Sequence, residues 1–235
     1  MRLNLQRLDL LRSSLPRAAS IILLAAAMGT LVSTAQAQQP APAGGSLTLM
    51  GGLDLPQNNG FGTGPMFRSI FDVAGAKLGF EGKFSFYRAT KHYTEGRSPE
   101  SNQQSILLLP YWRVTQHFAI GGGAQISHAS FDGIQKSGFA PTVGAHYDIL
   151  HGQTQVRIYG QANKDIAGNE NLPFRIEFGA TTQYWVTRNM AVSFGVEDSW
   201  ERFKQPFVAG QPMGSANSLR ALFGIAFSLD GFIRH

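Results

Sequence analysis

The sequence predicts an all-β protein: an antiparallel, up-and-down transmembrane β-barrel of eight to ten strands that follows a cleavable signal peptide. Three features of the chain favour this fold. A basic and then apolar leader comes first, apolar and polar residues alternate along the segments that follow, and short and long connections alternate between those segments. Alternation with a period of two puts successive side chains on opposite faces of a strand. In a membrane barrel the apolar face meets lipid and the polar face lines the lumen.

Residues 1–37 have the features of a Sec-type signal peptide. The basic region contains Arg2, Arg7, Arg12 and Arg17, the apolar region spans 18–32, and the small-x-small sequence at 35–37 marks a cleavage site. The apolar core at 21–28 is shorter than the roughly 20 residues that a spanning helix needs, so a membrane anchor is the less favoured alternative. Residues 38–45, rich in Pro, Ala and Gly, are expected to form a flexible lead-in, and residues 46–235 the barrel.

The composition narrows the classes of function. Removing residues 1–37, which carry four Arg and one Asp, lowers the formal net charge from +5 to +2. The chain has no basic cluster and no zinc-ligand spacing, so we expect no nucleic-acid partner. It has no cysteine, which excludes disulfides and thiolate chemistry. No His has the spacing of a metal site, and we expect neither a metal nor another cofactor.

The strand between Lys77 and Arg88 shows the pattern clearly. Its even positions are apolar (Leu78, Phe80, Phe84 and Phe86), and its odd positions are mostly charged or polar. Seven further segments alternate in the same way: 105–115, 118–127, 139–149, 155–161, 174–186, 190–199 and 219–229. We expect each of the eight to be long enough for the roughly 9 to 11 residues that a tilted membrane strand requires. A weaker pair near 47–54 and 67–73 raises the expected number from eight to ten, which we favour.

The connections support the same topology. Short links at 115–117, 150–152 and 187–189 alternate with longer polar segments at 89–104, 130–137, 164–173 and 201–217. Membrane barrels have short periplasmic turns and longer external loops. We therefore expect the longer segments, and the one at 56–65, to lie outside the cell.

The polar face predicts a charged lumen. Alternation assigns ten charged residues to it: Lys77, Glu81, Lys83, Arg113, Asp148, Arg157, Arg175, Glu177, Glu197 and Arg220. Opposite charges in a narrow lumen are expected to pair, because an isolated buried charge is costly. The interior of an eight-stranded barrel is just wide enough for side chains to fill. A polar plug is therefore the favoured interpretation, and a narrow pore is the alternative.

Aromatic residues near strand ends predict contact with the membrane interface. The candidates are Tyr87, Trp112, Tyr147, Tyr184 and Trp200. Aromatic girdles at both interfaces are typical of membrane barrels.

One short motif indicates an enzymatic alternative. His128-Ala129-Ser130 resembles the His-x-Ser motif of the lipid A deacylase family, whose barrels carry an outward-facing His, Ser and Glu. The resemblance implies that His128 is the general base and Ser130 the nucleophile. In the family an Asn soon follows the Ser and a Glu comes about a dozen residues later. Here Phe131 and Thr142 stand in those regions, so we expect no enzyme and assign no catalytic residue.

As a whole, residues 46–235 resemble the small outer-membrane β-barrel proteins of the OmpA/OmpX-like and porin families. The resemblance implies export through Sec to the outer membrane of a Gram-negative-type bacterium. It also implies contact with outer-membrane lipid and lipopolysaccharide, and passage through periplasmic chaperones and the barrel-assembly machinery. We expect a structural or narrow-transport role. A deacylase-like enzyme and an adhesin acting through external loops, in particular residues 201–217, remain alternatives.

Overall fold

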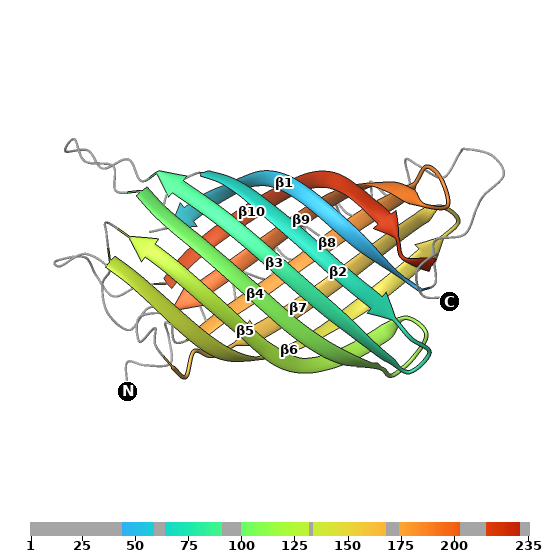
Figure 1. Cartoon of the computed structure of the whole chain (residues 1–235), viewed down its shortest axis with the longest axis horizontal. Coiled ribbons are helices and arrows are strands. Elements are labelled where there is room, and N and C mark those ends of the chain that lie inside the picture. The colour runs from blue at the N-terminus through green and yellow to red at the C-terminus, as the bar shows by residue number, and fades with distance from the viewer. Residues whose placement is uncertain are drawn as a thin grey trace, which may run out of the picture.

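The computed structural model is a closed barrel of ten antiparallel strands, each paired with its neighbours in the sequence (Figure 1). It describes residues 44–58, 64–90, 100–131, 134–167, 174–202 and 215–230. The strands are β1 (Gly45–Asn58), β2 (Gly64–Ala74), β3 (Leu78–Thr90), β4 (Glu100–Arg113), β5 (Phe118–Phe131), β6 (Ile134–His151), β7 (Thr154–Asn163), β8 (Phe174–Trp185), β9 (Met190–Arg202) and β10 (Ser215–Ser228). The preference for ten strands over eight is confirmed. The leader at 1–37 and most of the lead-in lie outside the described residues.

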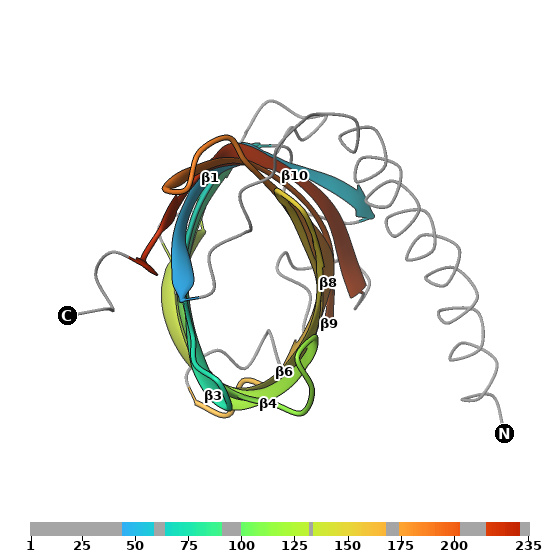
Figure 2. The ribbon, with the colours of Figure 1, turned by 90° about the vertical axis from the view of Figure 1, so that its right-hand side faces the viewer.

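The first and last strands close the ring. β1 pairs with β10 from Ser46 opposite Ser228 to Leu55 opposite Leu219. The backbone N–H of Leu229 donates to the carbonyl of Gly45 at 3.0 Å, which continues the pairing past the end of β10. Viewed from one end, the barrel is an oval ring (Figure 2). Closure leaves no strand edge without a partner, as a sheet in lipid requires.

Tight turns gather at one end of the barrel (Figure 1). In two of them, after β4 and after β8, a threonine has the same role. Thr115 Oγ1 accepts the N–H of Phe118 at 2.9 Å, and Thr187 Oγ1 accepts the N–H of Met190 at 3.1 Å. The turn after β6 contains Gly152 at φ 58°, a left-handed conformation that glycine adopts without steric cost. These turns match the predicted short links, and we call this the turn end.

At the opposite end the strands extend into the predicted external segments; β4, for example, begins at Glu100, inside the segment 89–104, and the difference is largest at 130–137. Residues 130–137 were expected to form a longer external segment, but β5 continues to Phe131 and β6 begins at Ile134. The alternation of apolar residues stops near Ile126 and Phe139, which is why the sequence pattern ended the strands too early. Because the backbone ladder continues with polar side chains, these strands extend beyond the apolar part of the wall.

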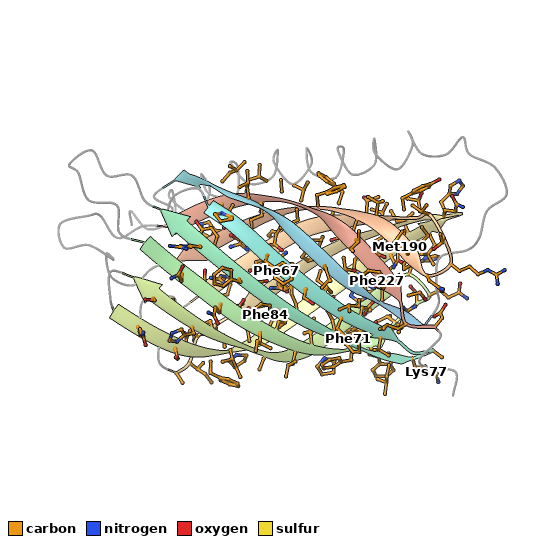
Figure 3. All side chains as sticks on the ribbon, turned by 45° about the horizontal axis from the view of Figure 1, so that its top comes forward. Phe67, Phe71, Lys77, Phe84, Met190 and Phe227 are labelled. Atoms are coloured by element: carbon orange, nitrogen blue, oxygen red, sulfur yellow. The ribbon has the colours of Figure 1, made fainter. Side chains whose placement is uncertain are left out.

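The exterior of the barrel is apolar. Large apolar side chains with more than a third of their surface exposed occur on every strand except β7, and Figure 3 shows Phe67, Phe71, Phe84, Met190 and Phe227 among them. Leu78, Trp112, Val143 and Phe223 are more than 60% exposed. A soluble protein would not leave so extensive a patch in water. The barrel is therefore a transmembrane one, with lipid against this belt.

No helix in the described part of the chain is long and apolar enough to cross a membrane.

Candidate functional site: the charged lumen

Charged side chains from most strands meet inside the barrel. Among the strand residues that face inward and whose side chains are described, cations and carboxylates are equal in number. The cations are Arg68, Lys83, Arg113, Arg157, Arg175 and Arg220, and the carboxylates are Asp54, Asp72, Glu81, Asp148, Glu177 and Glu197. Equal numbers of opposite charges satisfy one another without bulk water. The charges fall into three clusters along the lumen.

The first group, the Glu197 cluster, is centred on a carboxylate from β9 that is 0% exposed. Arg68 of β2 donates to both oxygens of Glu197, at 2.5 and 2.9 Å. Tyr159 of β7 and Arg220 of β10 each donate to it at 2.6 Å. The Nε of Arg220 also donates to Asp54 of β1 at 2.9 Å. One carboxylate therefore connects strands on opposite sides of the ring.

The second group, the Glu177 cluster, lies beside the first. Lys83 Nζ donates to Glu177 Oε2 at 3.2 Å and to Gln161 Oε1 at 3.0 Å. The amide nitrogen of Gln161 donates to the same Glu177 oxygen. Arg175 and Arg220 lie 3.7 and 3.5 Å from the other oxygen. Because Arg220 contacts both Glu177 and Glu197, the two clusters form one continuous network.

The third group, the Arg157 cluster, lies nearer the turn end. The Nε of Arg157 donates to Asp148 at 2.7 Å, and one terminal nitrogen donates to Asp72 at 2.9 Å. The other terminal nitrogen is 3.4 Å from Glu81. Tyr111 donates its hydroxyl proton to Asp72 at 2.8 Å. One guanidinium thus joins carboxylates from β2, β3 and β6 across the lumen.

Two more polar residues complete this end of the lumen. His146 is 5% exposed, and its Nε2 lies 3.7 Å from Asp148 Oδ2. Its ring meets that of Tyr111 edge to face, with centroids 4.8 Å apart. Arg113 lies at the mouth, where a terminal nitrogen donates to the carbonyl of Gln116 at 3.4 Å. These contacts hold the aromatic and imidazole rings against the Arg157 cluster.

Three cavities within the described lumen are small, and a more open hollow of about 540 Å³ lies between the turns, lined by residues 74–76 and 113–116. The first of the three cavities, on the side of the turn end, has a volume of about 130 Å³ and is lined by Arg113, Asp148 and Arg157 among others. The next two are about 30 and 20 Å³, which is room for about one or two water molecules each. Arg157 lines the first and second cavities, and Lys83 lines the second and third. Ser46, Asp72 and Gln155 also line both the first and second cavities, so Arg157 is one part of the boundary between them, and Lys83 is shared by the second and third.

The predicted lumen charges occupy different places. Nine of the ten project into the lumen or line its cavities, namely Glu81, Lys83, Arg113, Asp148, Arg157, Arg175, Glu177, Glu197 and Arg220. Lys77 does not. It is exposed in the turn between β2 and β3, at the turn end in Figure 3, so its assignment to the lumen was wrong. Strand β3 begins one residue later, and the alternation therefore does not apply to Lys77.

Of the five aromatic residues predicted at the membrane interface, four lie on the outer wall and one lies inside the barrel. Trp112 and Tyr147 are 62% and 46% exposed on the outer wall. Tyr184 and Trp200 are half-buried on the same face, where Trp200 meets Phe174 edge to face. Tyr87 is only 8% exposed and packs inside the barrel with Met50, Met66 and Leu222, so it is not an interface residue. Tyr87 and Lys83 are four residues apart on β3, so their side chains lie on the same face of the strand and both point into the barrel.

Several lumen residues were missed by the sequence analysis. Arg68 and Asp72 lie on β2 and Asp54 on β1, the two strands whose pattern was weakest. The alternation of apolar and polar residues is present on β2, where Arg68 and Asp72 alternate with the exposed Phe67 and Phe71, and it could have identified them as lumen residues. Tyr159 was missed because its aromatic ring looks apolar in the sequence, although its hydroxyl reaches Glu197.

The residues of the enzymatic alternative lie elsewhere, on the outer wall. His128 is exposed on β5, and its Nδ1 forms a hydrogen bond of 2.9 Å with Ser137 on β6. Ser130 lies further along β5, opposite Gln135. Thr142, where the deacylase pattern would bring a carboxylate, is 2% exposed and faces the lumen, on the other side of the sheet. A carboxylate at that position could not orient His128.

Among the described residues, no group of three or more His, Asp or Glu side chains is placed to hold a metal ion.

No known protein family matches the sequence, and no curated protein matches it. Solved structures do resemble the fold. The attachment invasion locus protein Ail of Yersinia pestis is 11% identical, with 78% of this chain and 97% of that one covered and a TM-score of 0.36. Neisserial surface protein A is 12% identical, with 80% and 99% covered and a TM-score of 0.42. An outer membrane channel from Pseudomonas putida F1 is 12% identical, with 83% and 99% covered and a TM-score of 0.43.

Ten antiparallel strands, an apolar belt on the exterior and a polar, charged interior are the features of an outer-membrane-type β-barrel.

Proposed function

We propose that the chain is a structural barrel of the outer membrane whose lumen is closed by ion pairs, and that it carries external segments on a rigid support. The observation that carries the proposal is the linked network around Glu197, Glu177 and Arg157, which joins opposite walls of the barrel. A pore for solutes would need a continuous water-filled path. In this barrel, the side chains of Arg157 and Lys83 stand between neighbouring cavities.

The proposal includes the route and surroundings of the protein. Export through Sec, handling by periplasmic chaperones, insertion by the barrel-assembly machinery and contact with lipopolysaccharide all follow from an outer-membrane location. The leader at 1–37 supports the first step. We propose a non-enzymatic role, because Thr142, where the deacylase pattern would bring a carboxylate, faces the lumen on the other side of the sheet from His128.

Location and orientation can be tested with single cysteines, since the natural chain has none. Gln135→Cys lies near the end opposite the tight turns, and Asn189→Cys lies in a tight turn; both positions are exposed. In intact cells a membrane-impermeant maleimide should label Gln135→Cys, whereas Asn189→Cys should react only after the outer membrane is permeabilised. Labelling of Asn189→Cys alone in intact cells would reverse the proposed orientation. Equal labelling of both variants in intact cells would contradict the proposal that the barrel spans the outer membrane.

The closed lumen makes a separate prediction: the inserted protein carries no ion current across a planar bilayer.

A further inference from the structure

The outer wall changes character along β4, β5 and β6. The last apolar row across these strands is aligned by the register of the ladder and consists of Ile106, Ile126 and Phe139. The next two outward rows are entirely polar. They consist of Gln104, His128 and Ser137, followed by Asn102, Ser130 and Gln135. We call these six residues the polar rows.

The polar rows belong to one side of the barrel only. On β8 and β9 the outward residues near the same end are Phe174, Ile176 and Trp200, and the rings of Phe174 and Trp200 are in contact. The polar rows therefore do not encircle the barrel. They form a patch on β4, β5 and β6, and the apolar row of Ile106, Ile126 and Phe139 borders it on the side toward the turn end.

The chemistry of the polar rows is that of hydrogen-bond donors without negative charge. They contain amides, hydroxyls and an imidazole, and no carboxylate. Arg88 of β3, which is exposed, pairs with Asn102 and adds a cation at the edge. The hydrogen bond between Ser137 Oγ and the Nδ1 of His128 orients the exposed ring, and Nε2 takes no part in that bond. Such a set suits phosphate and sugar oxygens.

The position of the polar rows identifies what lies beside them. Ile106 and Ile126 are 47% and 54% exposed in the apolar belt, so acyl chains cover the wall directly below the patch. The layer next to the acyl chains in any leaflet is the headgroup layer. We propose that the polar rows bind the phosphorylated saccharide headgroup of an outer-leaflet glycolipid. This inference rests on the proposed location and orientation.

The test is a titration of the full-length folded protein in detergent micelles with lipopolysaccharide. Heat unfolding is monitored by the electrophoretic mobility of the folded and unfolded protein. The readout is the lipopolysaccharide concentration that gives half of the maximal rise in the unfolding midpoint. The variant combines His128→Glu and Gln104→Glu, which places two carboxylates against the phosphates. Gln116→Glu adds the same kind of charge at the turn end, where the side chain is exposed, and is the matched control.

The double variant should raise the half-maximal concentration about tenfold or more, since losing one hydrogen bond to a charged group has at least that effect. The control should behave as the wild type does. Dephosphorylated lipopolysaccharide should stabilise the wild type less, and inorganic phosphate should not stabilise it.

Three results would overturn the inference: no stabilisation of the wild type by lipopolysaccharide, equal half-maximal concentrations for wild type and double variant, or equal stabilisation by inorganic phosphate. A fall in the unfolding midpoint of the double variant without lipopolysaccharide does not affect the comparison, because each protein is measured against its own baseline. If the proposed location or orientation is wrong, the cysteine labelling of intact cells shows it independently of the lipopolysaccharide titration.

Discussion

Removing the carboxylate of Glu197 should be among the most damaging single changes in the barrel. The side chain is fully buried and accepts four hydrogen bonds, two from Arg68 and one each from Tyr159 and Arg220. In Glu197→Leu, the hydrogen bond of Arg68 that remains among the described residues is the one from its Nε to Ser85 at 3.2 Å. Arg220 would keep Asp54 and Glu177.

The magnitude follows from the charge that is left behind. Breaking a buried pair by removing one partner costs about 3–5 kcal/mol, because the other charge remains buried without compensation. Replacing both members by apolar residues of similar volume is often nearly neutral. The variant Arg68→Leu/Glu197→Leu should therefore be less destabilised than the sum of the two single variants, by about 2 kcal/mol or more.

The assay is equilibrium unfolding in urea of protein folded into lipid vesicles, followed by tryptophan fluorescence. Ser199→Ala is a matched control on the same strand and face, where only a bond to Ser218 is lost, and should cost about 1 kcal/mol. A Glu197→Leu cost no larger than that of Ser199→Ala would refute the reasoning. Strict additivity of the Arg68 and Glu197 changes would refute it as well.

Three further changes test other parts of the barrel. Trp185→Ala removes an indole that is 1% exposed inside the lumen, and should lower the free energy of unfolding by about 3–5 kcal/mol in the same urea assay. Phe223→Arg puts a charge on a lipid-facing position that is 63% exposed, and should cost about 2–4 kcal/mol in vesicles if the position lies at mid-membrane, whereas Gln116→Arg in a turn should cost little. Gly79→Ala would place a methyl group against the ring of Tyr111, so the near-ultraviolet circular dichroism should change even if the barrel still folds.

Most of the wall was predictable because lipid outside and charge inside impose a period of two. On β9 the exposed Val192 alternates with the buried Ser193 and Glu197, and the sequence shows the same contrast. Strand ends were less predictable. Beyond Ile126 the outward positions are His128 and Ser130, so the apolar signal vanishes although the ladder continues.

The partners inside the lumen could not be derived from the pattern. Alternation shows that Arg157 and Asp72 both face inward, but not that they meet at 2.9 Å across the barrel. That contact depends on closure between β1 and β10 and on the relative heights of strands far apart in the sequence. Likewise, Lys77 and Tyr87 were misassigned because their roles depend on where β3 begins and on what packs opposite it.

Single-channel recording most directly tests the central claim that ion pairs close the lumen. Wild-type protein that has demonstrably inserted into a planar bilayer should carry no discrete current. The variant Lys83→Ala/Arg157→Ala removes a long cationic side chain from each boundary between neighbouring cavities and should show small, reproducible steps. Wild-type steps as large as those of the double variant would contradict a closed barrel and establish an open pore instead.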